Sequence, residues 1–393
     1  MRWAMQLAAV CAMSFASVRR RLDSALVALV GFAGVVLVVV AVLSIRAGFR
    51  ATLEDSGSPA VAIVLHGGTG TEVDSVLGGD SARIIAQSPG IALRSGRPML
   101  SPELLVQLEL RKRATGTVAD VSFRGVTSAA LQVHDGVRIV AGRMFTPGLD
   151  EIIVGTEAAR AFRGLRVGDT VRSGSYRWRV VGVFDDGGGL HDSEIWTSLP
   201  VLQAAYRRGD SLSSVYARLT APRAFSAFRR ALMGNPRLSV SVQRESDYFA
   251  AQAHAMALFI GIIGSAIAVL MGGGAVFGAV NTMYTAVAAR TREIATLRAL
   301  GFGPAVVLTS VLIEALALGA LGGLAGGVLA YALFDGFEAS TYNQFAVVAF
   351  RFEVSLHLLV VGLLYALAMG LAGGLLPAVR AARLPIAAAL RPE

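Results

Sequence analysis

Long apolar stretches occur at four places along the chain and predict its overall plan. Residues 255–289 contain no Asp, Glu, Lys or Arg, and residues 299–334 contain Glu314 alone among these types. A helix needs roughly 20 apolar residues to cross the hydrocarbon core of a bilayer, which is about 30 Å thick. The pattern therefore predicts four transmembrane helices, which we place at residues 22–46, 255–286, 302–334 and 354–379.

The first apolar run could also be a cleaved signal peptide. However, the run at 24–45 is too long for one, and no A-x-A-like cleavage site follows it closely. We therefore expect residues 22–46 to remain as a transmembrane helix. Residues 1–21, which end in an arginine triplet, are expected to form an amphipathic helix at the membrane interface.

Residues 47–252, between the first and second apolar runs, contain short segments with strand-like or helix-like spacing of apolar residues. This pattern is typical of a mixed α/β domain. Residues 135–145 and 151–155 predict strands, and residues 168–184 alternate around Ser-Gly-Ser as in a hairpin. Residues 200–209 and 221–236 carry apolar residues at helical spacing, each beginning near a proline. We expect two small lobes here, inserted between the first two spans. The Gly- and Asp-rich loop 184–194 has no role that the sequence reveals.

Arginine in the short connections predicts the orientation, because short cytoplasmic loops are enriched in basic residues. Three arginine groups fall on one side: Arg19, Arg20 and Arg21; Arg290, Arg292 and Arg298; and Arg380, Arg383 and Arg391. Both termini and the connection at 287–301 are therefore expected to be cytoplasmic. Residues 47–252 are then periplasmic or extracellular, and the protein lies in the plasma (inner) membrane.

Composition supports a membrane protein and disfavours other classes. Charged residues make up 16% of the chain and apolar residues 54%, whereas soluble domains are about a quarter charged. The net charge of +9 comes from scattered arginines, with Lys112 as the one lysine, so nucleic acid is not an expected partner. The one cysteine, Cys11, excludes an internal disulfide framework.

The sequence contains no recognisable catalytic or cofactor motif. It has neither a phosphate-binding G-x-x-x-x-G-K-[ST] loop nor a G-x-S-x-G elbow. The five histidines show no metal-ligand spacing such as H-E-x-x-H, so each is expected to be structural. We therefore predict a chain that is not an enzyme and that holds no cofactor or metal.

Two features inside the apolar runs suggest how the helices pack. Glu314 is the one acid there, and it is either a functional carboxylate or the partner of a neighbouring helix. Glycines spaced four apart allow helices to approach closely in lipid. The glycines for which we expect such packing are Gly319, Gly323, Gly327, Gly370 and Gly374.

The connection at 287–301 predicts a short amphipathic helix that breaks at Gly301. Ile294 and Leu297 fall on one face of this helix, with charged residues beside them. Such a helix could rest on anionic lipid or dock into a groove on a cytoplasmic partner.

This stretch also carries a resemblance to a known family. The run "AARTREIATLRALGFGPAVVLTSVLIEALALGALGGLAGG" and the ending "PAVRAARLPIAAALRPE" closely resemble the permease domain of the MacB/FtsX class of ABC transporters. The outer segments "VRIVAGRMFTPG", "EIIVGTEAARAF" and "LRVGDTVRSGSYRWRVVGVF" resemble the MacB-like periplasmic core domain of the same class. The resemblance covers nearly the whole chain.

The resemblance implies a dimeric, stand-alone permease without a fused ATPase, similar to DevC-like and MacB-like subunits. ATP and Mg²⁺ would bind a separate ATP-binding subunit, and the connection 287–301 would be the coupling helix that docks on it. The coupling residues would be Arg290, Arg292, Glu293, Ile294, Leu297, Arg298, Leu300 and Gly301.

The function implied is to transmit ATP-driven motion to the outer domain, for export or extraction of a substrate. A membrane-fusion (adaptor) protein is a possible further partner, and the second permease copy could be identical or paralogous. The alternative within the same fold is an FtsX-like regulatory permease that activates an envelope hydrolase. The sequence leaves the substrate open among lipoproteins, lipids, drugs and peptides.

Overall fold

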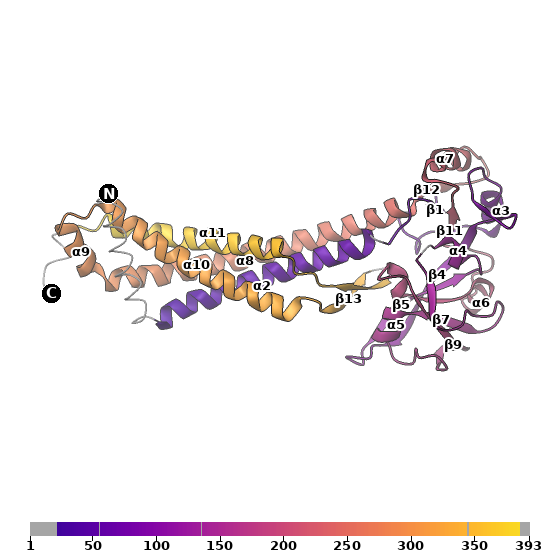
Figure 1. The fold of residues 1–393 in the computed structure, drawn as a ribbon, viewed down its shortest axis with the longest axis horizontal. Coiled ribbons are helices and arrows are strands. Elements are labelled where there is room, and N and C mark those ends of the chain that lie inside the picture. Colours follow the sequence, from indigo (N-terminus) through magenta and orange to yellow (C-terminus); the bar gives the residue numbers. More distant parts are fainter. Residues whose placement is uncertain (1–21, 55, 135, 344–345, 386–393) are drawn as a thin grey trace. The chain divides into compact units, whose positions relative to one another are not determined.

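The computed structural model describes the chain except for residues 1–21, 55, 135, 344–345 and 386–393 (Figure 1). The predicted interfacial helix at 1–21 lies outside the described residues. The chain forms two compact units. One, the helical unit, comprises residues 1–48, 257–337 and 352–393, and the other, the sheet unit, comprises residues 49–256 and 338–351.

Four helices in the described part of the chain are long and apolar enough to cross a membrane. They are α2 (Leu22–Glu54), α8 (Glu245–Ala289), α10 (Pro304–Phe334) and α11 (Leu356–Ala382), and Figure 1 shows them running alongside one another. Helix α8 begins ten residues before the predicted span at 255. An apolar run predicts only the part of a helix that can lie in the hydrocarbon core. The helix itself can extend beyond this part, because backbone hydrogen bonds also form where the side chains are polar.

Glycines bring the backbones of α10 and α11 into contact. A Cβ atom at Gly319 would lie 2.8 Å from the Ala366 carbonyl oxygen, and one at Gly370 would lie 2.8 Å from the Ala315 carbonyl oxygen. A Cβ at Gly323 would meet the Ala366 side chain at 2.8 Å, and one at Gly374 would meet that of Ala315 at 2.5 Å. Gly327 is less crowded, since its nearest neighbour, Leu359 Cδ2, is 3.5 Å away. Small residues thus permit the α10–α11 approach within one chain.

The sheet unit is built on one continuous path of hydrogen-bonded strands, in the order β12-β1-β11-β4-β5-β10-β7-β9-β6, with β8 beside β9. The strand bounds are β1 (Val61–His66), β4 (Leu100–Arg111), β5 (Val118–Val126), β6 (Arg138–Gly142), β7 (Glu151–Gly155), β8 (Thr170–Ser173), β9 (Tyr176–Asp185), β10 (Ile195–Ser198), β11 (Ser214–Arg218) and β12 (Val240–Arg244).

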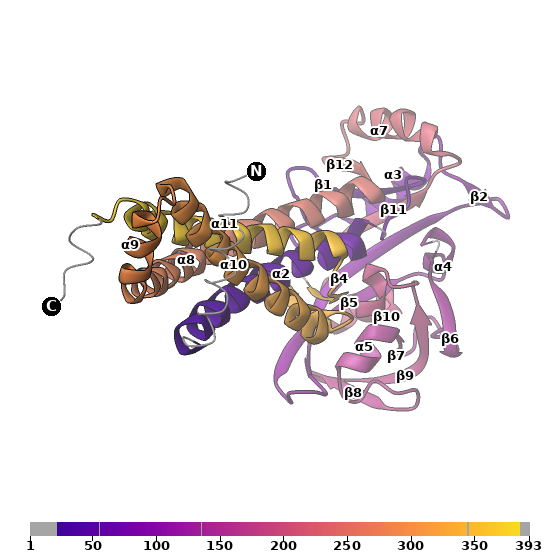
Figure 2. The ribbon, with the colours of Figure 1, turned by 60° about the vertical axis from the view of Figure 1, so that its left-hand side comes forward.

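Strand β4 joins the two halves of this sheet. Its first residues pair with β11 and its last eight pair with β5, both antiparallel. The segment that was expected to form two lobes therefore contains one continuous sheet, and β4 belongs to both halves of it. Short helices lie beside it, and Figure 2 shows α5 next to β7 and β9. They are α3 (Gly79–Ala86), α4 (Ala130–Val133), α5 (Thr156–Ala161), α6 (Leu199–Ala205) and α7 (Phe225–Met233), with 3-10 turns η2 (Leu190–Ser193) and η3 (Pro222–Ala224).

Two hairpins show where the pattern of the sequence was informative and where it was not. The hairpin predicted at 168–184 is confirmed: β8 and β9 pair antiparallel, with Ser173 opposite Tyr176 around Gly174 at φ +58°.

A second hairpin, β13 (Glu338–Asn343) with β14 (Ala346–Arg351), belongs to the sheet unit although it lies between α10 and α11 in sequence. A minor pair, β2 (Leu93–Arg94) and β3 (Arg97–Pro98), completes the strands described.

Candidate functional site

The connection between α8 and α10 forms the helix α9 (Thr291–Ala299). The chain turns at Arg290 before α9, and Gly301, at φ +94°, ends it after Leu300. Glycine adopts this left-handed conformation without the steric cost that a Cβ adds. Pro304 then starts α10 in the first turn, where its missing N–H is harmless.

The two faces of α9 have different surroundings. Ile294 is buried and packs with Val307 and Val311 of α10 and Ala378 of α11. The helical spacing correctly indicates a buried face, but the structure places Ile294 in the core of the chain itself. The exposed residues of the outward face include Arg292, Glu293 and Leu300, the last 73% exposed.

Polar contacts hold α9 to the neighbouring helices. Arg298, which is half-buried like Leu297, donates a hydrogen bond from Nη1 to the Leu384 carbonyl oxygen at 2.6 Å. Arg290 forms an ion pair with Glu314, and both side chains are 8% exposed. The acid of the third apolar run therefore pairs with the residue just before α9, as the structural alternative for Glu314 had suggested.

A second cluster of charges lies buried in the sheet unit, around Arg124 of β5. Its guanidinium donates hydrogen bonds to Glu72 at 2.8 and 3.1 Å, to Glu103 at 2.9 Å and to Glu194 at 2.7 and 2.8 Å. The side chain of Arg124 is 1% exposed and those of its three partners are 5% exposed or less. Burial by itself lowers the pKa of Arg124, but the carboxylates outweigh it and raise that pKa well above its ordinary value.

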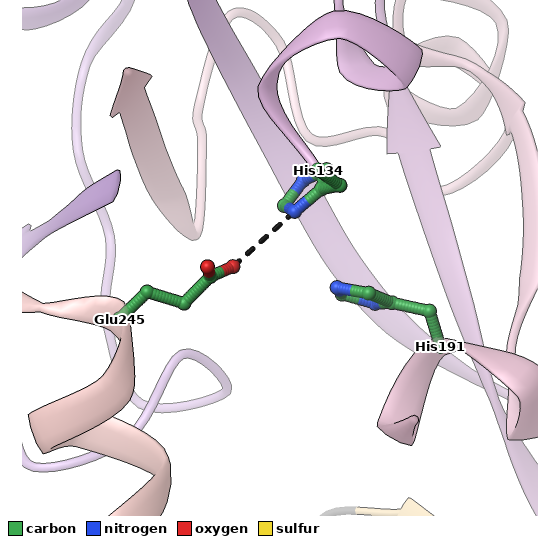
Figure 3. A group of neighbouring side chains, drawn as sticks. All are labelled: His134, His191 and Glu245. Carbon is green, nitrogen blue, oxygen red and sulfur yellow. Dashed lines mark hydrogen bonds and ion pairs between the residues drawn. The ribbon is translucent and has the colours of Figure 1, made fainter. Parts of the chain in front are cut away.

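Two histidines extend the cluster through Glu103 and Glu194, and Figure 3 shows them with Glu245. His134 follows α4, and its Nε2 lies 2.9 Å from Glu103 Oε1 while its Nδ1 lies 3.3 Å from Glu245 Oε1. Nδ1 of His191, in η2, lies 3.1 Å from Glu194 Oε2, which also accepts a hydrogen bond from Trp196 Nε1. The two imidazole centroids are 4.6 Å apart.

The carboxylates control the protonation of this cluster. Burial lowers the pKa of His134, yet the charge of Glu103 and the hydrogen bonds to both glutamates raise it to about 10. Burial raises the pKa of Glu194, but the charge of Arg124 more than offsets it and holds that pKa far below its usual range. The site is therefore a buried network in which one guanidinium and two histidines face four glutamate carboxylates.

A cavity of about 290 Å³ opens beside the histidines. Its lining includes His134, His191, Glu245, Asp186 and Ser58. Glu245 is fixed there because its Oε2 accepts a hydrogen bond from the Ser58 backbone N–H at 2.9 Å.

Sequence reasoning missed this cluster because its members come from separate elements. His134 and Glu245 are 111 positions apart, and Arg124 and Glu194 are 70 apart. The loop 184–194, to which no role was assigned, supplies His191 and Glu194. One signal was present: Glu103 directly precedes the apolar run Leu104-Leu105-Val106, and Arg124 directly follows Phe123, so each charge adjoins apolar strand residues and needs a partner if it is buried.

In the part of the chain that the structure describes, four helices long and apolar enough to cross a membrane occur together with a second compact unit built on a sheet. The chain belongs to the MacB/FtsX family of ABC transporter permeases. Residues 24–234 match the MacB-like periplasmic core domain, and residues 265–386 match the FtsX-like permease C-terminal domain.

Individual relatives agree with this membership. The uncharacterised ABC transporter permease YvrN of Bacillus subtilis is 32% identical over 40% of this chain and 39% of YvrN. The macrolide export ATP-binding/permease protein MacB of Hyphomonas neptunium is 27% identical over 99% of this chain and 61% of that protein. The chain thus spans less than two thirds of these relatives' length. The extracellular domain of the transporter YknZ from Gram-positive bacteria aligns with 47% of this chain at 16% identity and a TM-score of 0.36.

Proposed function

We propose that this chain is a permease subunit that transmits the ATP-driven motion of a separate ATPase to its sheet unit. Family membership supports the assignment to ABC transporters. In this proposal ATP and Mg²⁺ bind the partner ATPase, two permease copies form the transporter, and the sheet unit acts on the substrate outside the membrane.

The observation that carries the proposal is the construction of α9. Its inner face is anchored by Ile294, by the Arg290–Glu314 pair and by the bond from Arg298 to Leu384. A force applied to α9 would therefore act directly on α10 and α11. Its outer face offers a cation, an anion and an apolar residue at Arg292, Glu293 and Leu300, a set suited to a protein groove.

The exposed Leu300 gives a direct test of ATPase docking. Leu300→Asp would bury an unpaired carboxylate in the interface, at a cost of several kcal/mol. We expect at least about a 10-fold loss of ATPase co-purification, since each 1.4 kcal/mol is a factor of ten. The matched control is Leu93→Asp, at a leucine that is 67% exposed in the sheet unit.

Both variants should insert and solubilise as the wild type does, because neither leucine is buried. Wild-type recovery of the ATPase with Leu300→Asp would refute the docking role of α9. If α9 instead lies on anionic lipid, Leu300→Asp should leave recovery of the ATPase unchanged. The arginines of α9 would then dominate its binding to the lipid, at about 1 kcal/mol each.

A further inference from the structure

His134, His191 and Glu245 are arranged as metal ligands. One donor atom from each lies within 4.8 Å of the others, and all three residues are buried. Nδ1 of His134 and Oε1 of Glu245 are 3.3 Å apart. Zinc–ligand bonds of about 2.0–2.2 Å in a tetrahedron place neighbouring ligand atoms roughly 3.3–3.5 Å apart, so this pair already has the separation required.

Each imidazole has an outer hydrogen bond that directs its other nitrogen into the site. Nε2 of His134 lies 2.9 Å from Glu103, and Nδ1 of His191 lies 3.1 Å from Glu194. A carboxylate that accepts the N–H of one ring nitrogen fixes the tautomer and leaves the opposite nitrogen as a ligand, which is the usual second layer of a zinc site. The inward atoms are then Nδ1 of His134 and Nε2 of His191, and Figure 3 shows the three side chains converging.

Arg124 holds both of these outer carboxylates in place. Its guanidinium contacts Glu103 at 2.9 Å and Glu194 at 2.7 Å, and all three side chains are 3% exposed or less. The donor set is therefore supported by buried groups whose positions are restricted. Such preorganisation lowers the cost of assembling a metal site.

The charge around the site favours a divalent cation. Among the described residues, Arg124 faces Glu72, Glu103 and Glu194, and Glu245 adds a further carboxylate. Asp186, whose pKa is raised by burial, lines the same cavity, and the Tyr216 ring packs against His134 at a centroid distance of 4.7 Å. One guanidinium does not balance these carboxylates. A metal held between the two rings would replace the proton between His134 Nδ1 and Glu245 Oε1, which are 3.3 Å apart, and would supply positive charge at that position.

The cavity supplies an open coordination position and a route of entry. Its volume of about 290 Å³ is lined by all three ligands, and Gly136 and Gly189 lie at its wall. Two imidazoles and a carboxylate with an open fourth position are typical of Zn²⁺ sites, and this nitrogen and oxygen set also accepts Co²⁺.

We propose that His134, His191 and Glu245 form a Zn²⁺-binding site in the sheet unit. The metal joins the end of α4, the loop before β10 and the first residue of α8. No short ligand motif exists in the sequence, which is why the histidines were expected to be structural. This proposal does not depend on the ATPase docking of α9.

The test uses the full-length chain in detergent, purified through a tag without histidines, stripped with EDTA and reloaded with Zn²⁺. We expect one Zn²⁺ per chain by elemental analysis after gel filtration. Glu245→Gln and His191→Gln should bind Zn²⁺ at least about 10-fold more weakly, because each removes a ligand. The matched control His254→Gln, at an exposed histidine of α8, should bind as the wild type does.

Two further measurements separate loss of Zn²⁺ binding from loss of folding. They are thermal unfolding with and without Zn²⁺, and X-ray absorption of the wild type. Zn²⁺ should raise the unfolding midpoint of the wild type, since a ligand that binds the folded state stabilises it, and should not raise that of Glu245→Gln. X-ray absorption at the zinc edge of the wild type should show two imidazole ligands. The proposal is overturned if the reloaded wild type retains no Zn²⁺ after gel filtration, if both ligand variants bind Zn²⁺ as well as the wild type does, or if the spectrum lacks two imidazoles.

Discussion

At the scale of single residues, Arg124 is the group on which the sheet unit depends most. Its five hydrogen bonds compensate three buried carboxylates, which come from the loop after β1, from β4 and from the residue just before β10. Removing one partner of a buried ion pair is strongly destabilising, because the remaining charge stays buried without compensation. The cluster therefore tolerates no single neutral replacement at its centre.

Arg124→Met tests this dependence. We expect a loss of about 3–5 kcal/mol in the stability of the sheet unit, against less than about 1 kcal/mol for the control Arg138→Met, whose ion pair with Asp185 is on the surface. Tryptophan fluorescence during thermal unfolding reports on this unit, because Trp178 and Trp196 are both fully buried in it. Similar midpoints for the two variants would contradict the central role of Arg124.

Glu151 of β7 gives a prediction for acid. The hydrogen bond from Arg143 outweighs the effect of burial and lowers the pKa of Glu151 to about 2. A lowered folded-state pKa stabilises the fold above the unfolded value, near 4.5, and this contribution disappears as the pH falls toward 2. Glu151→Gln should thus cost about 1–2 kcal/mol at pH 6, reduced by screening because Arg143 is half-exposed, and almost nothing at pH 2. The tryptophan unfolding midpoint at both pH values measures this difference, and an equal cost at both would exclude the ion pair as its source.

At the scale of elements, the close approach of α10 and α11 depends on glycines that face a backbone. Gly319 lies against the Ala366 carbonyl and Gly370 against that of Ala315, and their Cα atoms are near each other. In lipid, where apolar burial drives helices together only weakly, such close packing is a main source of association. A larger side chain at these positions has no room without separating the helices.

Gly319→Leu should therefore destabilise the helical unit, while Gly274→Leu should have little effect. A Cβ at Gly274 of α8 would meet nothing within 4 Å. Gly274→Leu therefore makes the same change of residue without displacing a neighbour, and it serves as the control. The readout is the fraction of chain that stays monodisperse in detergent during heating, with proteolysis of α10 and α11 as a second measure. Equal behaviour of the two variants would show that the α10–α11 contact contributes little.

At the scale of the whole molecule, the arginine asymmetry predicts which parts of the chain face the cytoplasm. The clusters at 290–298 and 380–383 flank the ends of apolar helices, and Arg290 is partly occupied by its pair with Glu314. We expect α9 to be cytoplasmic and the hairpin β8–β9 to be on the outer side.

Single cysteines test this orientation on whole cells. In a Cys11→Ser background, Arg292→Cys and Ser175→Cys place a thiol at two exposed positions, one in each unit. A membrane-impermeant maleimide should label Ser175→Cys in intact cells and Arg292→Cys only after permeabilisation. Labelling of both in intact cells, or of neither, would refute the predicted topology.

The sequence by itself determined what depends on local composition and period. Apolar runs marked α2, α8, α10 and α11, alternation around Ser-Gly-Ser marked the β8–β9 hairpin, and family motifs identified the permease class. These properties can be predicted from sequence for two reasons. A bilayer requires a long apolar run, and the two faces of a helix or strand require apolar residues at fixed intervals.

Only the tertiary structure decided which charges meet. It buried Ile294 within the chain, paired Arg290 with Glu314, and brought His134, His191 and Glu245 together from elements up to 111 positions apart. A buried charge requires a partner, but the partner is set by strand order and by the path of loops, neither of which leaves a periodic trace in the sequence.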